Sequence, residues 1–223
     1  MGKDKLRRWA ELETFERTFQ PKMDFPMPDF YLKGKWNSDV FKNENPIVLE
    51  LGCGRGEYTV HLAKNFPQKN FIGIDIKGAR LWRGAKTINE EKILNAAFVR
   101  MRIEFIENFF SPHEIGEIWL TFPDPQIKDK REHRRLTHPA FIERYKRMMK
   151  PNGILHLKSD SAEFYEYTLQ SLAQEQGKFL VKTNDLYNSH IVDEILSIKT
   201  TYENIFLKEG KKITYIKFQF GEG

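Results

Sequence analysis

Glycine recurs at every second position directly after a strongly apolar run. The segment from Glu50 to Glu57 reads E-L-G-C-G-R-G-E, with glycines at Gly52, Gly54 and Gly56. Glycine lets the backbone turn tightly and lets a ligand approach where a Cβ atom would otherwise stand. The dinucleotide fingerprint G-x-G-x-x-G requires a glycine where this chain has Glu57. The spacing therefore predicts a ligand-binding turn of another kind, and a tight turn without ligand is the alternative.

Two further carboxylates stand at the ends of apolar runs. Asp75 ends the run N-F-I-G-I-D, where an acid can accept both hydrogens of a ribose diol. A cap on the following helix is a compatible alternative for Asp75. Asp124 stands between Pro123 and Pro125, and the two proline rings fix the backbone on both sides of it. This predicts a rigidly held acid beside a ligand, with a proline-rich turn as the alternative.

Cations cluster shortly after the second proline. Five of them fall within eight residues, diluted by Asp129 and Glu132: Lys128, Lys130, Arg131, Arg134 and Arg135. A second basic group follows at Arg144, Lys146, Arg147 and Lys150. Such clusters can bind a phosphate backbone, and a solvated surface is the alternative interpretation.

These residues are positioned by alternating strands and helices. Apolar runs at 46–52, 70–76, 96–101, 117–122 and 153–160 predict strands, and amphipathic segments at 56–66, 77–92, 137–150 and 162–177 predict helices. Late strands are expected at 178–185 and 212–220. This order predicts an α/β, Rossmann-like doubly wound sheet of seven strands, mostly parallel, with an antiparallel edge strand and helices on both faces.

The N-terminal 45 residues are predicted to differ from the rest. Apolar residues from Leu6 to Phe19 recur every three or four positions, which indicates an amphipathic helix stopped by Pro21. The following segment contains two prolines within D-F-P-M-P and is predicted to be an extended arm. We therefore divide one overall domain into residues 1–45, a helix and arm, and residues 46–223, the ligand-binding part.

Composition excludes several classes of protein. The chain has 223 residues, a net charge of +5, 40% hydrophobic residues and a single cysteine, Cys53. It is therefore not disordered and has no internal disulfide or cysteine-based zinc site. The six histidines lack metal-ligand spacing, and no apolar run approaches the roughly 18 residues of a membrane span. Since the N-terminus also lacks a signal peptide, we expect a cytoplasmic protein without a metal or a membrane contact.

Together the motifs carry a family resemblance. An acid followed by G-x-G-x-G resembles motif I of class I S-adenosylmethionine-dependent methyltransferases. The sequence F-P-D-P at 122–125, followed by the basic run, resembles the bacterial tRNA (guanine-N7-)-methyltransferase family. Ser159-Asp160 and the segment 200–203, T-T-Y-E, are similar to that family's later motifs. The resemblance extends from about Glu50 to the C-terminus.

The resemblance implies a role for each matching residue. Contacts with S-adenosylmethionine are implied for Glu50, Gly52, Gly54, Gly56, Asp75, Arg102 and Asp124, where Met101-Arg102 replaces the family's Asp-Ala pair. Contacts with the substrate nucleotide are implied for Lys128, Asp160, Thr200, Thr201, Tyr202 and Glu203. Contacts with the RNA backbone are implied for Lys130, Arg131, Arg134 and Arg135. The implied partner is tRNA, no protein partner is implied, and the implied target is a variable-loop guanine, position 46 of the tRNA.

Guanine N7 is chemically consistent with these residue types. N7 carries an unprotonated lone pair at neutral pH, so its methylation requires no general base. The site must align the base and stabilise the positive charge that develops on it, which a carboxylate can do. Asp124 is the candidate catalytic residue, and Asp160 is the other carboxylate that can contact the base. The alternatives are methylation of an exocyclic amine on another RNA or protein, and a non-catalytic RNA-binding subunit that keeps the fold.

Overall fold

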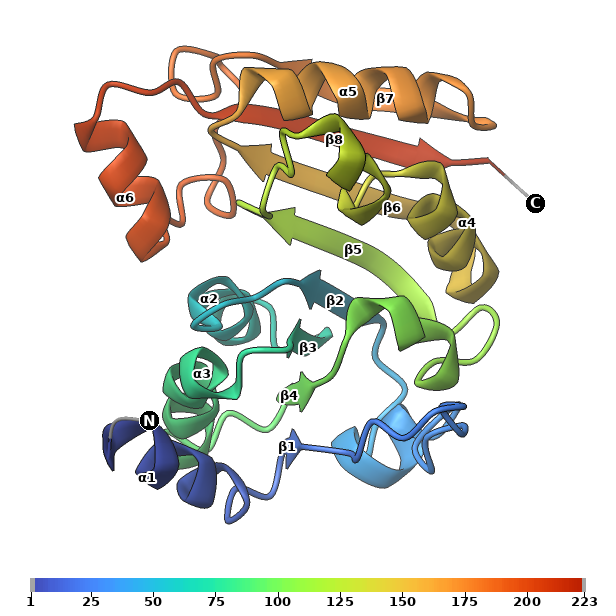
Figure 1. The fold of residues 1–223 in the computed structure, drawn as a ribbon, viewed down its shortest axis with the longest axis vertical. Helices are drawn as coiled ribbons and strands as arrows, with labels where there is room; N and C mark the ends of the chain where they lie inside the picture. Colours follow the sequence, from blue (N-terminus) through green and yellow to red (C-terminus); the bar gives the residue numbers. More distant parts are fainter. Residues whose placement is uncertain (1–2, 222–223) are drawn as a thin grey trace.

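A single eight-stranded sheet organises the chain (Figure 1). The computed structural model describes residues 3–221. The strand order is β1-β4-β3-β2-β5-β6-β8-β7, and β8 runs antiparallel to both of its neighbours while the other pairs are parallel. The strands are β1 (Thr18–Phe19), β2 (Ile47–Leu51), β3 (Asn70–Asp75), β4 (Ala96–Arg100), β5 (Ile115–Thr121), β6 (Met149–Ser159), β7 (Gly177–Thr183) and β8 (Thr214–Phe220).

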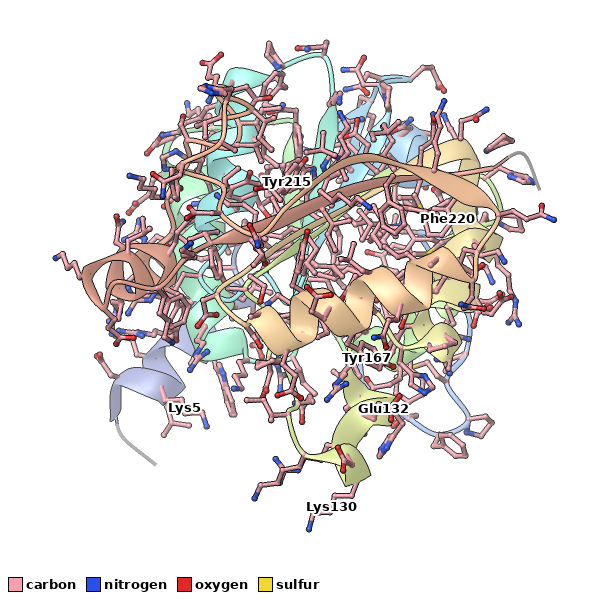
Figure 2. All side chains as sticks on the ribbon, turned by 90° about the horizontal axis from the view of Figure 1, so that it is seen from above. Lys5, Lys130, Glu132, Tyr167, Tyr215 and Phe220 are labelled. Carbon is pink, nitrogen blue, oxygen red and sulfur yellow. The ribbon has the colours of Figure 1, made fainter. Side chains whose placement is uncertain are left out.

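Helices cover both faces of this sheet. One hydrophobic cluster joins the sheet to η1, η2, α4 and α5, and the other joins it to α1, α2, α3 and α6. The helices are α1 (Lys3–Leu12), η1 (Trp36–Phe41), α2 (Glu57–Asn65), α3 (Gly78–Glu90), η2 (Ile103–Asn108), η3 (Asp129–Arg134), α4 (Pro139–Met148), α5 (Ala162–Ala173) and α6 (Thr201–Lys208). The short helix η3 projects from the body of the molecule and carries Lys130 at its tip (Figure 2).

The centre of the sheet is built from continuous apolar runs. All five residues of β2 are buried, and alternate side chains enter the two clusters: Leu49 packs in one and Val48 in the other. This is the pattern of a parallel strand covered on both faces. The chain goes from β2 to β3 and β4 on one side, then crosses to β5 on the other side. The ends of β2 and β5 therefore meet at the topological switch point, where such sheets bind ligands.

The predicted fold class is confirmed, with one additional strand. The seven predicted strands correspond to β2 through β8, and the eighth is the two-residue strand β1 from the N-terminal segment. The antiparallel pairing is at the predicted edge, where β8 lies one place inside the edge strand β7.

The N-terminal helix is shorter than its apolar periodicity predicts. It ends at Leu12 instead of continuing to Phe19, because Thr18 and Phe19 pair in parallel with β4 at the sheet edge. Threonine and phenylalanine favour strands, and the sheet edge supplies the partners for their backbone groups. The arm is also not extended throughout: it turns at residues 31–35 into η1, whose Trp36 is fully buried. The division into residues 1–45 and 46–223 stays a prediction.

Candidate active site

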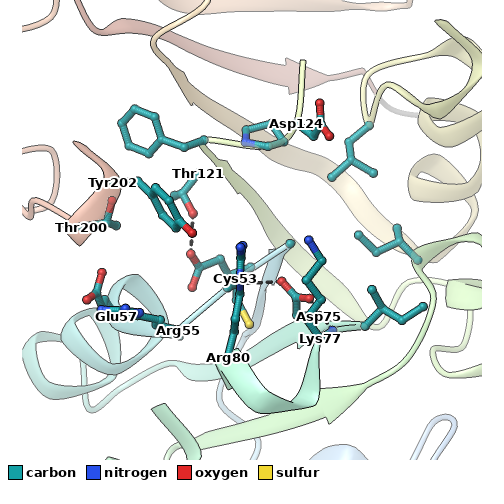
Figure 3. Close-up of a pocket in the computed structure, with 18 of the residues that line it drawn as sticks. Cys53, Arg55, Glu57, Asp75, Lys77, Arg80, Thr121, Asp124, Thr200 and Tyr202 are labelled. Atoms are coloured by element: carbon teal, nitrogen blue, oxygen red, sulfur yellow. Dashed lines mark hydrogen bonds between the residues drawn. The ribbon is translucent and has the colours of Figure 1, made fainter. Parts of the chain in front are cut away.

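The glycine turn connects β2 to α2 and faces the end of β3 (Figure 3). The Asp75 carboxylate accepts hydrogen bonds from the backbone N–H of Gly54 at 2.9 Å and of Lys77 at 2.7 Å. A Cβ added at Gly54 would meet no atom within 4 Å, so this position opens onto space. The turn thus brings a bare backbone and a fixed carboxylate to the same place, as a small-molecule ligand requires.

Gly56, unlike Gly54, is required for close packing against the core. A Cβ at this position would lie 2.4 Å from the Phe98 ring, and the φ angle of +69° also disfavours a side chain. Gly56 therefore lets the start of α2 pack closely on β4. Of the three predicted cofactor-binding glycines, Gly52 and Gly54 line the cavity, and Gly56 holds the turn against the core.

Glu50 lies beneath the turn with its carboxylate buried. Its oxygens accept hydrogen bonds from the Thr59 backbone N–H at 2.8 Å and from the hydroxyls of Thr59 and Thr121. Burial raises the pKa of Glu50 to about 7, although these hydrogen bonds oppose the shift. The three donors tie the ends of β2 and β5 to α2, and Glu50 also forms part of the cavity wall above.

A cavity of about 330 Å³ opens above the glycine turn. This volume lies within the range of small-molecule sites, about 300–1,000 Å³. A second cavity of about 300 Å³ adjoins it and shares Gly52, Asp75, Ile76, Ile103, Arg134 and Leu136. The shared isoleucines and leucine form an apolar lining directly beside the Asp75 carboxylate. That combination fits an adenosine group, because a carboxylate can bind a ribose and apolar side chains can cover a purine ring.

Asp124 stands on the rim of the same cavity (Figure 3). Its side chain is exposed and accepts a hydrogen bond from the backbone N–H of Gln126 at 3.1 Å. The backbone N–H of Phe122 donates to the Lys158 carbonyl at 2.9 Å, which ties this turn to β6. The proline-bounded turn therefore holds Asp124 at the cavity rim, and its carboxylate keeps oxygen lone pairs free for a ligand.

The first turn of α6 forms another part of the wall. Thr200 and Tyr202 line the cavity, and the Tyr202 ring is covered by the Arg80 guanidinium at 5.7 Å. Thr201 donates to the Glu57 carboxylate from its backbone N–H at 2.7 Å and from its hydroxyl. Glu57 at the start of α2 thereby fixes the start of α6, although the two lie 144 residues apart.

Glu203 differs from its predicted role in substrate contact. Its carboxylate is fully buried, 2.8 Å from the Lys158 ammonium, and accepts a hydrogen bond from the Tyr187 hydroxyl at 2.6 Å. Lys158 also donates to the carbonyls of Leu196 and Ile198, and burial lowers its pKa. Because these partners enclose the carboxylate, Glu203 anchors α6 and the segment before it to β6.

The basic run divides into exposed and buried members. Lys128, Lys130 and Arg131 are exposed, and Arg134 lines the cavity. Arg135 corrects the prediction of a backbone contact, because it is only 6% exposed. Its guanidinium donates to the carbonyls of Gln126 and Ile127 and to the Glu163 carboxylate, and it lies over the Tyr167 ring at 4.3 Å. Arg135 therefore holds the loop and is not free for a phosphate.

Three other predicted residues lie outside the main cavity. Lys128 precedes η3 and does not line it. Asp160 follows β6 and is paired with Lys211 at 2.8 Å. Arg102 lines the adjoining cavity, with its guanidinium 3.1 Å from Glu104. The structure thus gathers Glu50, the glycine turn, Asp75, Asp124, Thr200 and Tyr202 in one place and leaves these three at its margins.

Some contributors to the site were missed by sequence reasoning. Thr121 binds the Glu50 carboxylate, Glu57 binds α6, and Arg80 covers Tyr202. Nothing in the local sequence marks Thr121 or Glu57 for these contacts. Arg80 stands on one helical face with Lys77, Arg83 and Lys86, a pattern more typical of a solvated surface than of an RNA contact. Ile76 did carry a signal in the sequence, because it directly follows the acid that ends a strand; in the structure it is 46% exposed beside the cavity.

Neither a metal-binding cluster nor a membrane-spanning helix occurs among the described residues. Within residues 3–221 no three or more His, Cys, Asp or Glu side chains gather in a way that could hold a metal ion. Across the same residues no helix combines the length and apolar character needed to cross a membrane.

Known proteins resemble this chain along nearly all of its length. A family model described as "Putative methyltransferase" matches residues 44–216. A tRNA (guanine-N(7)-)-methyltransferase of Christiangramia forsetii is 54% identical over 98% of both chains. One of Bacteroides thetaiotaomicron is 49% identical over 98% of this chain and 86% of its own.

Solved structures share the fold at low sequence identity. The 16S rRNA methyltransferase KamB has a TM-score of 0.63 at 11% identity, covering 82% of this chain and 92% of its own. A geranyl diphosphate C-methyltransferase of Streptomyces coelicolor, solved with S-adenosyl-L-homocysteine, has a TM-score of 0.55 at 15% identity, covering 83% and 74%.

The fold and the site define the class of Rossmann-like methyltransferases. Within that class, the chain belongs to the tRNA (guanine-N7-)-methyltransferase family. The family and the enzyme class predicted from the glycine turn, F-P-D-P and the basic run are therefore confirmed.

Proposed function

We propose that this enzyme methylates N7 of the variable-loop guanine of tRNA, with S-adenosylmethionine bound over the glycine turn and the guanine held against Asp124. One observation carries the proposal: the Asp124 carboxylate stands on the rim of the cavity whose floor is formed by Gly54 and Asp75. A carboxylate for the base and a cradle for an adenosine group thus face the same space.

The cavity offers a matching group for each part of the cofactor. Asp75 keeps lone pairs for a ribose diol, since its two backbone hydrogen bonds use only part of its acceptor capacity. Ile76, Ile103 and Leu136 would cover the adenine, and the space at Gly54 would receive the rest of the molecule. When bound, S-adenosylmethionine supplies a methyl group on a positively charged sulfur.

The remaining chemistry falls to residues on the cavity wall. Asp124 can accept hydrogen bonds from guanine N1–H and the N2 amino group, which orients N7 and leaves its lone pair free. The same carboxylate stabilises the positive charge that methylation leaves on the purine. Tyr202, held under the Arg80 guanidinium, offers a ring face for stacking the base. None of these steps needs a side chain to take a proton before attack.

The experiment is a methyl-transfer assay on bulk tRNA followed by nucleoside analysis. We expect 7-methylguanosine, and a transcript whose variable-loop guanine is replaced by adenine should accept no methyl group. A methylated exocyclic amine as the product would support the alternative reaction, and no product would support the non-catalytic alternative. Methylation of the replaced transcript to the normal extent would overturn the assignment of the target base.

The other expected properties belong to the proposal as well. A tRNA substrate supports a cytoplasmic location. The reaction needs no metal, because the developing charge is on the base and a carboxylate can stabilise it. We propose that the chain acts without an obligatory protein partner, since residues for the cofactor and for the base both come from it.

A further inference from the structure

The clusters of basic side chains in this protein differ in how many of their cations are paired with carboxylates. On α4, Arg147 lies 2.9 Å and Arg144 lies 3.5 Å from the Glu107 carboxylate. Lys146 lies 2.9 Å from Glu143 and 2.8 Å from Glu175. Three of the four cations in the second basic cluster, all except Lys150, are therefore balanced by carboxylates of the same chain and offer little net attraction for a polyanion.

Another basic surface forms where α1 packs beside α3 (Figure 1). Two tryptophan rings organise it: Trp82 is covered by four cations at 4.8 to 5.7 Å, and Trp9 is covered by two at 4.9 and 5.2 Å. We call this the α1–α3 surface, and its cations are Lys5, Arg7, Arg8, Lys77, Arg80, Arg83, Lys86 and Arg100.

The cations of this surface outnumber the carboxylates that contact them. Arg7 and Arg8 share Asp4 and Glu11, and Arg83 and Lys86 share Glu90. Eight cations against three carboxylates leave an excess of five, as large as the net charge of the whole chain. Within residues 3–221, Lys5, Lys77, Arg80 and Arg100 have no carboxylate within 4.0 Å.

The α1–α3 surface is continuous with the reaction cavity. Lys77 and Arg80 line that cavity, and Arg80 lies over Tyr202. Asp124 and the loop to η3 form a different part of the rim. Lys5 and Lys130 nevertheless lie toward the same side of the molecule, at the lower edge of the view in Figure 2. A long polyanion that enters the cavity can therefore contact basic residues on both sides of it.

We infer that the α1–α3 surface is a second tRNA-binding surface, which holds backbone phosphates away from the target base. Lys5 and Arg100 are held over the Trp9 ring, and the Ile76 carbonyl also accepts a hydrogen bond from Arg100 at 3.3 Å. They are thus kept in place without loss of charge, an arrangement that suits phosphate contacts. The inference rests on the proposed function, because tRNA is the polyanion that the cavity selects.

The test removes three charges from this surface and compares tRNA binding over a range of salt concentrations. The variant is Lys5→Gln, Arg83→Gln and Arg100→Gln, and none of these residues lines the cavity. If each binds one phosphate, the log–log salt slope should fall by about two to three units and the Kd for tRNA should rise at least about tenfold. Affinity for S-adenosylhomocysteine should be that of the wild type.

The matched control removes three charges from α4: Arg144→Gln, Lys146→Gln and Arg147→Gln. Its salt slope should stay near that of the wild type, because these three cations are matched by three carboxylates at 2.8 to 3.5 Å. In the α1–α3 variant, by contrast, Lys5 and Arg100 have no such partner among residues 3–221, and Arg83 shares Glu90 with Lys86 at 3.6 to 3.8 Å. Equal weakening in both variants would overturn the inference, since it would reveal a general charge effect. Wild-type Kd and slope in the α1–α3 variant would also overturn it.

The thermal stability of the variants and the methyl-transfer activity are measured separately from tRNA binding. If the thermal midpoint of the triple variant falls, the charge reversal Lys5→Glu with Arg83→Glu replaces it, because both side chains are exposed. This pair should flatten the salt slope in the same way, and an unchanged slope would overturn the inference. If the wild-type enzyme binds tRNA without forming 7-methylguanosine, that result contradicts the proposed function. It does not contradict the inference that the α1–α3 surface binds tRNA.

Discussion

Two carboxylates at neighbouring strand ends have opposite environments. Glu50 is 4% exposed and its oxygens are occupied by threonine donors, whereas Asp75 borders the cavity and receives two backbone N–H groups. Asp75 is therefore the carboxylate available to a cofactor, and Glu50 holds the turn together. The family resemblance implied cofactor contact for both.

Replacing Asp75 by alanine should weaken cofactor binding strongly. The change removes a charge-assisted pair of hydrogen bonds to the ribose, which costs on the order of 1.5–3 kcal/mol, or about 10- to 150-fold in affinity. Calorimetry with S-adenosylhomocysteine measures this loss. Asp75→Asn keeps one acceptor oxygen for Gly54 or Lys77 and should lose less. Unchanged affinity in the alanine variant would refute the ribose assignment.

Glu50 should make stability depend on pH. Its folded pKa of about 7 lies above the usual 4.5, so the folded state binds the proton more tightly than the unfolded state. The stabilisation is complete below pH 4.5 and is lost as pH rises through 7, by up to about 3 kcal/mol. Urea unfolding at pH 5 and pH 8 should show this decline in the wild type and a smaller one in Glu50→Gln. Parallel profiles for the two proteins would contradict the prediction.

Asp124 should matter more for turnover than for cofactor binding. Asp124→Asn keeps the shape of the side chain but removes the charge that stabilises the methylated purine. We expect the methyl-transfer rate at saturating tRNA to fall by roughly 100-fold, the size of one electrostatic contact in a transition state. Affinity for S-adenosylhomocysteine should change far less. Equal losses in rate and affinity would make Asp124 a binding residue only.

At the scale of elements, a buried ion pair connects α6 to the sheet. The Lys158 ammonium on β6 is fully buried beside Glu203, and it also binds two carbonyls of the segment that leads to α6. This pair positions Thr200 and Tyr202 on the cavity wall from beneath.

Removing one partner of this pair should destabilise the fold. Lys158→Met leaves the Glu203 carboxylate buried without its cation, which should cost about 3–5 kcal/mol in the free energy of unfolding. The double variant Lys158→Met, Glu203→Gln should recover most of this loss, because the amide keeps a partner for the Tyr187 hydroxyl. Urea unfolding of the two single variants and the double variant measures the coupling. Purely additive losses would argue against a buried pair.

The elements could be predicted where local sequence determines them. The apolar run of β2 and the glycines after it define a strand and a turn without reference to distant residues. Phe19 shows the limit: its spacing continues a helical face, but the edge of β4 recruits it into a strand. That outcome depends on a partner about 80 residues away in the chain.

The same limit applies to the site. Arg135 and Glu203 read as exposed charges in sequence, yet each is buried against a partner far along the chain, Glu163 and Lys158. Composition around a charged residue does not reveal such pairing, because the partner's position is set by the sheet order. Asp75 and Asp124 were predictable because strand ends in a parallel sheet converge at one edge.

At the scale of the molecule, positive charge surrounds the cavity unevenly. The helices α1 and α3 supply one basic surface, and η3 with the loop before it supplies the other. The cations of α4 are neutralised by neighbouring carboxylates. The modest net charge of +5 therefore conceals a local excess of cations beside the cavity, an arrangement that favours the approach of a polyanion.

Removing charge at η3 should weaken tRNA binding without affecting the cofactor. Lys130 and Arg131 are exposed, have no carboxylate within 4.0 Å among residues 3–221, and do not line the cavity. If each contacts one phosphate, Lys130→Ala with Arg131→Ala should reduce the log–log salt slope of tRNA binding by about one and a half to two units. Filter binding measures this slope. The salt range is about 50 to 300 mM, over which the affinity due to phosphate contacts falls steeply.

Arg135→Ala provides the contrast for this loop. Since its guanidinium is buried on two carbonyls and the Tyr167 ring, the substitution should lower the thermal midpoint and leave the salt slope of the folded protein nearly unchanged. Lys130→Ala with Arg131→Ala should do the reverse, because exposed charges contribute little to stability. A wild-type slope in the Lys130 and Arg131 variant would make η3 a solvated surface, and tRNA binding would then depend on the α1–α3 surface alone.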